Sequence, residues 1–180
     1  MMSSRKFFIL FSLCAALPLF AAQISLVMGW FNQTTTNKGQ WLQHDIQLLP
    51  DATTAGDQST DPSVHWHLVF VQAAVCDQQC EQALFTLQQL YLGLGRKQLT
   101  TKPLVIAPQQ PAQLNKFPAI AWHAEQNTAQ ELQNQIVIVN QRGLALLRYP
   151  VDGNPEHMRD LAKNIRTDLL RLINYDRSGA

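Results

Sequence analysis

The chain has 180 residues, which is enough for one domain and an accessory segment. Its formal net charge is +1, so we expect neither a nucleic acid nor an anionic substrate as a partner. Charged residues make up 15% of the chain, and glutamine and asparagine supply much of the remaining polar surface. This composition is typical of a soluble globular domain and excludes a disordered or strongly charged chain.

Residues 1–31 are predicted to be a cytoplasmic N-terminus followed by a membrane anchor. Arg5 and Lys6 precede a long stretch without charged residues, Phe7–Phe31. An α-helix over that stretch would be about 37 Å long at about 1.5 Å per residue, and a hydrocarbon core is about 30 Å thick. We therefore predict an uncleaved transmembrane helix, with Trp30 near the far interface.

A cleaved signal peptide is the alternative for the same segment. Cleavage after Ala21 would place Leu19 where the usual cleavage site has a small residue, so the sequence favours the anchor. Positive charges before the span and none close behind it keep the N-terminus in the cytoplasm, so the rest of the chain is exported. Cys14 is interpreted as a thiol within the span.

Residues 32–63 are predicted to be a polar juxtamembrane linker. It contains W-L-Q-H-D-I-Q-L-L at 41–49, between polar stretches rich in threonine, glycine, asparagine and aspartate. The apolar residues of this segment do not alternate cleanly with polar ones, so the pattern allows a short strand without requiring it.

Residues 64–180 are predicted to be the compact domain. His65–Val75 is rich in β-branched and aromatic residues and suits a buried strand, and P-L-V-I-A at 103–107 suits a second one. A helix is predicted between them, with Cys76 in the preceding loop or at the cap and Cys80 about one turn into the helix, because apolar residues after Cys80 recur at helical spacing. These residues are Leu84, Leu87, Tyr91 and Leu94.

The C-terminal part is predicted to be a short helix, a hairpin and a long helix. A capping-box pattern begins at Thr128, and the run at 135–149 is two strands around N-Q-R-G, with Gly143 available for a left-handed turn. Asn154 can cap the last helix, with Pro155 at its first position. The complete order predicts an α/β, thioredoxin-like fold, in which helices flank a central mixed sheet.

Cys76 and Cys80 lie at the junction between the first core strand and the first helix. A helix N-terminus presents unpaired N–H groups and a partial positive charge, and both favour a reactive thiolate. At this spacing the two Cα atoms would be about 6 Å apart, within reach of a disulfide. Two sulfur ligands would also select Cu(I) or another soft ion. A disulfide that closes so short a loop adds little stability, so we predict reactive cysteines, with a structural disulfide as the alternative.

Four features together resemble the Sco/SenC family. They are the N-terminal span, a T-N-x-G-x-x-L stretch at 36–42, a W-x-L-V-F-V strand at 66–71 and the C-x-x-x-C motif at 76–80. The stretch I-V-I-V-N-Q-R-G-L-A-L-L-R-Y-P is similar to the hairpin of a small bacterial branch of that family, described as cytochrome oxidase-associated. The resemblance extends over most of residues 34–173.

The resemblance implies a membrane-anchored assembly factor that handles copper or thiols while the copper centre of cytochrome c oxidase matures. By this resemblance, Cys76 and Cys80 correspond to the family's two cysteines, which implies that they exchange disulfides and also bind the metal. The family's third ligand is a histidine shortly before the late hairpin strand, where this sequence has none, and His123 is the nearest candidate. The implied partners are an oxidase subunit or its copper-centre cysteines. The implied location is the bacterial inner membrane, with the C-terminal domain in the periplasm.

Three functions remain open at the level of sequence, and so does the question of whether the chain is an enzyme. The leading hypothesis is oxidase assembly by dithiol–disulfide exchange, by Cu(I) delivery or by both, with Cys76 as the more exposed cysteine. The alternatives are a general periplasmic thiol oxidoreductase and a non-catalytic partner protein with a structural disulfide. His65 and His67 share one face of the first core strand and are expected at the strand end away from Cys76.

Overall fold

The computed structural model describes residues 4–27, 37–50, 63–73, 75–125 and 130–176. The chain divides into two compact units, residues 1–36 and residues 37–180. The predictions made for Trp30, for most of the linker at 51–62 and for a helix cap at Thr128 lie outside the described residues.

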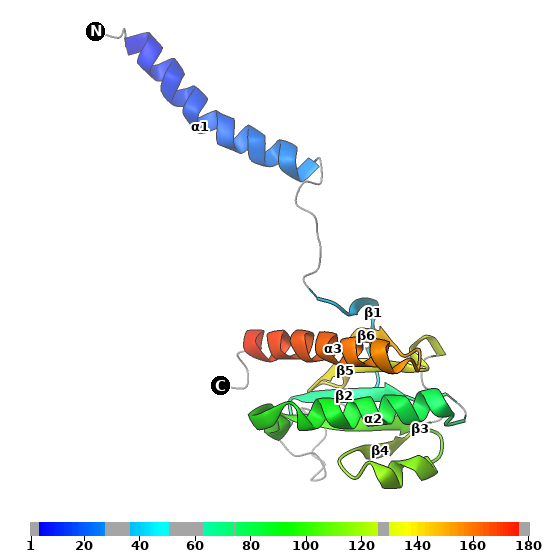
Figure 1. The fold of residues 1–180 in the computed structure, drawn as a ribbon. Coiled ribbons are helices and arrows are strands. Elements are labelled where there is room, and N and C mark those ends of the chain that lie inside the picture. Colours follow the sequence, from blue (N-terminus) through cyan, green and yellow to red (C-terminus); the bar gives the residue numbers. More distant parts are fainter. Residues whose placement is uncertain (1–3, 28–36, 51–62, 74, 126–129, 177–180) are drawn as a thin grey trace. The chain divides into compact units, whose positions relative to one another are not determined.

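The first unit contains the helix α1 (Ser4–Val27), which includes Pro18 (Figure 1). The Ser25 hydroxyl donates a hydrogen bond of 2.8 Å to the carbonyl of Ala21, one turn earlier. Among the residues whose side chains the structure describes, no helix is both long enough and apolar enough to span a membrane. The membrane anchor therefore remains a prediction from the sequence.

The second unit is built on a six-stranded sheet with the spatial order β1-β6-β5-β2-β3-β4 (Figure 1). Strand β2 pairs parallel with β3 and antiparallel with β5, and β3 pairs parallel with β4, so the sheet is mixed, as predicted. The strands are β1 (Gln40–Gln47), β2 (Trp66–Val71), β3 (Thr101–Ala107), β4 (Ala121–Ala124), β5 (Gln135–Asn140) and β6 (Leu144–Pro150).

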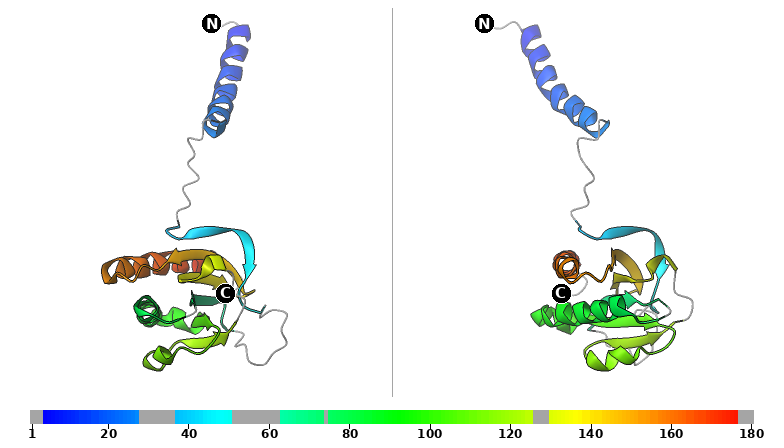
Figure 2. Two further views of the ribbon diagram at one scale, coloured as in Figure 1. Left: turned by 90° about the vertical axis from the view of Figure 1, so that its right-hand side faces the viewer. Right: turned by 45° about the vertical axis from the view of Figure 1, so that its right-hand side comes forward.

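Two helices, α2 (Gln78–Leu92) and α3 (Pro155–Tyr175), cover one face of the sheet (Figure 2). Alternate residues of a strand point to opposite faces, so Leu68 and Phe70 of β2 pack beneath these helices while Val69 and Val71 point away from them. On that other face, Leu48, Leu49 and Leu132 complete a second apolar cluster. Burial on both faces explains why the central strands are almost continuously apolar.

The C-terminal elements form as predicted, for local reasons. Gly143 closes the β5–β6 hairpin with φ +77°, and its N–H bonds the carbonyl of Asn140 at 2.9 Å. The Asn154 side chain accepts a hydrogen bond from the Glu156 N–H, with Pro155 as the first residue of α3. The short strand that the sequence allowed near residue 41 is β1, which pairs antiparallel with β6.

One predicted boundary is wrong, and one strand was missed. The first core strand ends at Val71 rather than Val75, because the chain then turns into the loop that carries Cys76. Helix α2 begins at Gln78, because Asp77 caps it, and it contains Cys80 in its first turn, as predicted. Strand β4 was not predicted, because four residues are too few to show a period and its pairing with β3 comes from distant sequence.

A buried carboxylate joins the start of the unit to its last helix. Asp168 of α3 is fully buried, and its Oδ2 accepts hydrogen bonds from the Lys38 N–H (2.7 Å), the Gly39 N–H (2.8 Å) and the Tyr149 hydroxyl (2.8 Å). A Cβ atom on Gly39 would lie 2.4 Å from the Tyr149 ring. Glycine in the T-N-x-G-x-x-L stretch is therefore required by this close approach.

Candidate functional site

The cysteine pair lies at the sheet edge where the parallel strands end. Strands β2 and β3 pair parallel and in register up to Val71 and Ile106, so the segments that follow both strands emerge at one edge. Strand β5 starts opposite Val71, and β6 ends opposite the start of β5, so the loop 151–154 also emerges there. The topology thus gathers three loops that are far apart in the sequence.

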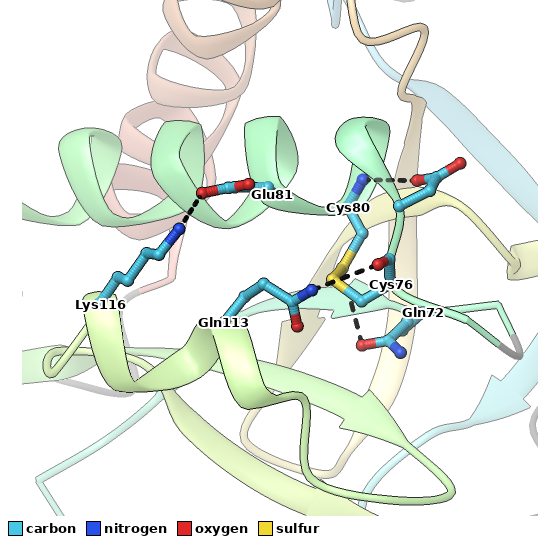
Figure 3. The surroundings of a disulfide bond; sticks show 7 residues. Gln72, Cys76, Cys80, Glu81, Gln113 and Lys116 are labelled. Atoms are coloured by element: carbon cyan, nitrogen blue, oxygen red, sulfur yellow. Dashed lines mark hydrogen bonds and ion pairs between the residues drawn. A yellow bond between two sulfur atoms is a disulfide. The ribbon is translucent and has the colours of Figure 1, made fainter.

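Cys76 and Cys80 form a disulfide with their Cα atoms 5.1 Å apart (Figure 3). Cys80 is 1% exposed and belongs to the apolar core beneath α2, whereas Cys76 is half-buried in the loop. The structure therefore brings the two predicted cysteines together and leaves Cys76 as the more exposed of them.

The start of α2 is determined by its N-cap. The Asp77 carboxylate accepts a hydrogen bond from the Cys80 N–H at 3.0 Å, and the Asp77 carbonyl accepts one from the Glu81 N–H at 3.0 Å. This cap places Cys80 in the first turn of the helix. It also occupies the Cys80 N–H and adds a negative charge nearby, so this helix end favours a thiolate less than an uncapped one would.

Two glutamines contact the cysteine pair from different elements (Figure 3). The side chain of Gln72, which follows β2 and is 8% exposed, places its Oε1 3.7 Å from the Cys80 Sγ. Gln113 lies in the 3₁₀ helix η2 (Ala112–Lys116) and donates from Nε2 to the Cys76 carbonyl at 3.3 Å. One amide therefore meets the buried sulfur, and the other fixes the backbone of the more exposed cysteine.

A groove of about 470 Å³ opens beside Cys76. It is lined by residues 108–113 of the loop after β3, together with Gln72, Val75 and Cys76, and none of these side chains is charged. Val75 is 78% exposed next to the disulfide. The groove beside the disulfide therefore has no charged side chain in its lining that would select an ionised ligand.

The surroundings of the groove are held by an ion pair and by a close backbone contact. Lys116 of η2 donates to the Glu81 carboxylate of α2 at 2.7 Å, on the exposed side of the helix (Figure 3). In the loop before α3, Gly153 has φ +74°, and a Cβ there would lie 2.7 Å from Cγ of Gln79. This loop therefore packs directly against the segment between the two cysteines.

His123 is not brought to the cysteines. It lies on β4 opposite Ile106 of β3, whose side chain packs on the sheet face away from α2. Paired residues on neighbouring strands point to the same face, so His123 and Cys80 are on opposite sides of the sheet. Among the described residues, no group of three or more His, Cys, Asp or Glu side chains is placed to hold a metal ion.

His65 and His67 lie at the other end of β2, as predicted. His65 Nδ1 is 2.9 Å from Oε1 of Gln141, the residue that follows β5. Burial, and secondarily the charge of Lys102, lowers the pKa of His67 to about 4, so this imidazole is neutral at physiological pH. Both histidines therefore lie at the end of β2 away from the cysteine pair.

Neither Gln72 nor Gln113 was predicted from the sequence as a residue of the site. Asp77 carried a signal, because aspartate before an apolar helical run is a typical N-cap. Nothing marks Gln72 or Gln113 in a chain so rich in glutamine, because their importance comes only from the loops that the sheet brings together.

A mixed sheet with two helices on one face, and a cysteine pair where the first core strand meets its helix, defines a thioredoxin-like protein. The chain belongs to the family described as transmembrane-like, thioredoxin-like, C-terminal domain, whose model matches residues 66–175.

Among solved structures, the chain is similar to apo Sco1 from Thermus thermophilus, with a TM-score of 0.50 and 14% identity over 78% of this chain and 99% of that one. It also matches a SCO1/SenC family lipoprotein from Bacillus anthracis str. Ames, with a TM-score of 0.39 and 10% identity over 69% of this chain and 95% of that one. No curated protein sequence is significantly similar. At such low identity, the similarity to Sco1 shows a shared fold.

Proposed function

We propose that this chain is a thiol–disulfide exchange protein that acts on the copper-centre cysteines of cytochrome c oxidase during assembly. One observation carries the exchange activity: Cys76 lines an uncharged groove while its disulfide partner Cys80 is buried behind it. This asymmetry supports an attacking cysteine and a resolving cysteine. The choice of client rests on the resemblance to the Sco/SenC family.

The exchange reaction follows from that asymmetry. In the reduced protein, the Cys76 thiolate attacks one sulfur of a client disulfide, and the other client sulfur leaves as a thiolate that takes a proton from water. Cys80 then attacks the Cys76 Sγ of the mixed disulfide and releases the second client thiol. Two electrons pass to the client, and an external thiol reductant returns the Cys76–Cys80 disulfide to the dithiol.

Copper is a cargo in the second arm of the proposal. Reduced Cys76 and Cys80 offer two soft sulfur donors, which is a set that Cu(I) accepts. Anaerobic titration of the reduced full-length chain with Cu(I), compared with the Cys76→Ser variant, tests this arm. His123→Ala is a control, because His123 lies on the opposite face of the sheet from Cys80, and Cu(I) binding should be unchanged in it.

We also propose that residues Phe7–Phe31 anchor the chain in the bacterial inner membrane, with the C-terminal domain in the periplasm. The support is the charge-free sequence of that stretch, preceded by Arg5 and Lys6. Alkaline extraction of membranes tests the anchor, and protease added to spheroplasts tests the orientation. Release of the chain at high pH would exclude an integral anchor.

Trapping of the client tests the exchange reaction in cells. Cys80→Ser leaves a Cys76 mixed disulfide unresolved, so we expect an oxidase subunit linked to this variant on non-reducing gels, and none linked to Cys76→Ser. Cys14→Ser is the matched control, because Cys14 is a free cysteine in α1, outside the site. Oxidase activity should fall in both site variants and not in the control.

The same variants distinguish the competing functions. If trapped partners are many and include no oxidase subunit, the chain is a general thiol oxidoreductase. If no partner is trapped and oxidase activity under copper limitation is unchanged in both site variants, the exchange function is rejected. Co-purification of an oxidase with the double serine variant would instead favour a non-catalytic partner protein with a structural disulfide.

A further inference from the structure

Gln72 holds a polar side chain against the buried sulfur of the pair. Its Oε1 lies 3.7 Å from the Cys80 Sγ, and the side chain is 8% exposed. Figure 3 shows its amide oxygen, not its nitrogen, pointing toward the sulfur. Cys80 otherwise belongs to the apolar cluster beneath α2, which includes Phe70 and Leu84.

The position of Gln72 is fixed by the sheet. Gln72 follows β2 directly, and its backbone N–H donates to the carbonyl of Ile106 on β3 at 3.0 Å. This hydrogen bond continues the β2–β3 ladder by one residue, so the amide is presented from the rigid sheet edge rather than from the loop. Cys80 is likewise fixed by the Asp77 cap of α2.

The contact differs between the two redox states. A sulfur in a disulfide has no hydrogen to donate, so the 3.7 Å contact between the Cys80 Sγ and the Gln72 Oε1 is not a hydrogen bond in the oxidised pair. Reduction gives Cys80 an S–H group, which can donate to that oxygen.

We propose that Gln72 is a positioning residue that raises the reduction potential of the Cys76–Cys80 pair by hydrogen-bonding Cys80 only in the reduced state. Breaking the disulfide forms two thiols, and the amide stabilises one of them. A higher potential makes the disulfide easier to reduce. This inference deepens the proposed exchange function and rests on it only for its biological use.

The effect is measured on the purified full-length protein at equilibrium with glutathione. Two glutathione thiols reduce the protein disulfide and become one glutathione disulfide, with two electrons and two protons passing to Cys76 and Cys80. One net hydrogen bond corresponds to a change of about threefold to tenfold in this equilibrium constant. A tenfold change is about 30 mV for a two-electron couple.

Gln72→Met keeps a side chain of similar length and removes both polar atoms. We expect this variant to be about threefold to tenfold harder to reduce than the wild type. Gln89→Met is the matched control, because Gln89 is an exposed residue of the same helix as Cys80 and lies outside the groove. An equilibrium constant unchanged within twofold in Gln72→Met would overturn the proposal and leave Gln72 as a space-filling residue.

Infrared spectroscopy of the reduced wild-type protein tests the same contact without relying on the folding of a Gln72 variant. A hydrogen-bonded Cys80 S–H should absorb at lower frequency than a free thiol, and the shifted band should vanish in Cys80→Ser. A Cys80 band at the free-thiol frequency would overturn the proposal. Neither measurement needs a client, so a failed trapping experiment and a failed role for Gln72 are distinguishable.

Discussion

Replacing Asp168 with alanine removes an acceptor shared by three elements of the domain. Its Oδ2 binds the backbone N–H groups of Lys38 and Gly39, which lead into β1, and the hydroxyl of Tyr149 on β6. The carboxylate is fully buried on α3 and Tyr149 is 2% exposed, so water does not replace these bonds without rearrangement. We therefore expect a large loss of stability from this one substitution.

The magnitude follows from the donors left behind. Lys38 is partly exposed and can turn to water, which leaves the N–H of Gly39 and the hydroxyl of Tyr149 as buried, unpaired donors. Each such group costs about 1–3 kcal/mol, so the sum is about 2–6 kcal/mol. Removing a buried charge recovers part of this cost, and we expect a net loss of about 3 kcal/mol.

Denaturant unfolding of the purified chain measures this loss as a shift of the midpoint. The midpoint temperature of thermal unfolding should fall by about 6–12 °C, because a loss of about 3 kcal/mol shifts it by about 2–4 °C per kcal/mol in a domain of this size. Asp160→Ala is the matched control. Asp160 is an exposed carboxylate of the same helix, and among the described residues its ion-pair partner is Lys163. The control midpoint should not move. A loss below about 1 kcal/mol for Asp168→Ala would refute the reasoning, since desolvation would then cancel the bonds.

Three further predictions concern other residues of the sheet. Gly143→Ala should destabilise the domain more than Gly95→Ala in denaturant unfolding. Both glycines have positive φ, but an added Cβ would lie 1.9 Å from the Leu49 carbonyl oxygen at Gly143, whereas at Gly95 it would meet nothing within 4 Å. Equal losses of stability in the two variants would contradict the close approach at Gly143. The pKa of His67 is lowered to about 4, so the stability that its neutral form contributes is complete above pH 6.5 and is lost as the pH falls toward about 4. This loss of unfolding free energy amounts to about 3 kcal/mol at most. In His67→Gln, the unfolding free energy should therefore depend less on pH between 6.5 and 4. Burial, and then Asp168, raises the pKa of Tyr149 above its ordinary value, so the stability from its neutral form is full below about pH 10 and is lost above it. Tyr149→Phe should remove that alkaline slope, and an unchanged slope would exclude Tyr149 as its source.

The sequence predicted the elements whose signals are local. The hairpin at Gly143 and the capped start of α3 at Asn154 depend on residues within one turn or one helix end. The helix of the cysteine motif was predicted from its apolar spacing, with Cys80 in its early part, although the cap at Asp77 was not predicted. Strand β4 escaped prediction because it exists only through its pairing with β3.

For the candidate site, too, the local features were predicted from the sequence and the long-range ones were not. The spacing of Cys76 and Cys80 before an apolar helical run was enough to predict two sulfurs within bonding distance at a helix start. Which histidine could approach them was not predictable, because the answer depends on strand order. Strand β4 is two strands away from β2, and its register turns His123 to the opposite face.

Alone, the amino-acid sequence determined the class of fold and the place of the cysteine pair at a helix start, because hydrophobic period, turn residues and helix caps act over a few neighbouring residues. Only the tertiary structure decided that Gln72 faces the buried sulfur, that Gln113 holds the Cys76 carbonyl and that Asp168 ties the chain entering β1 to α3. Those contacts join residues that are distant in sequence, and their geometry follows from sheet topology and register.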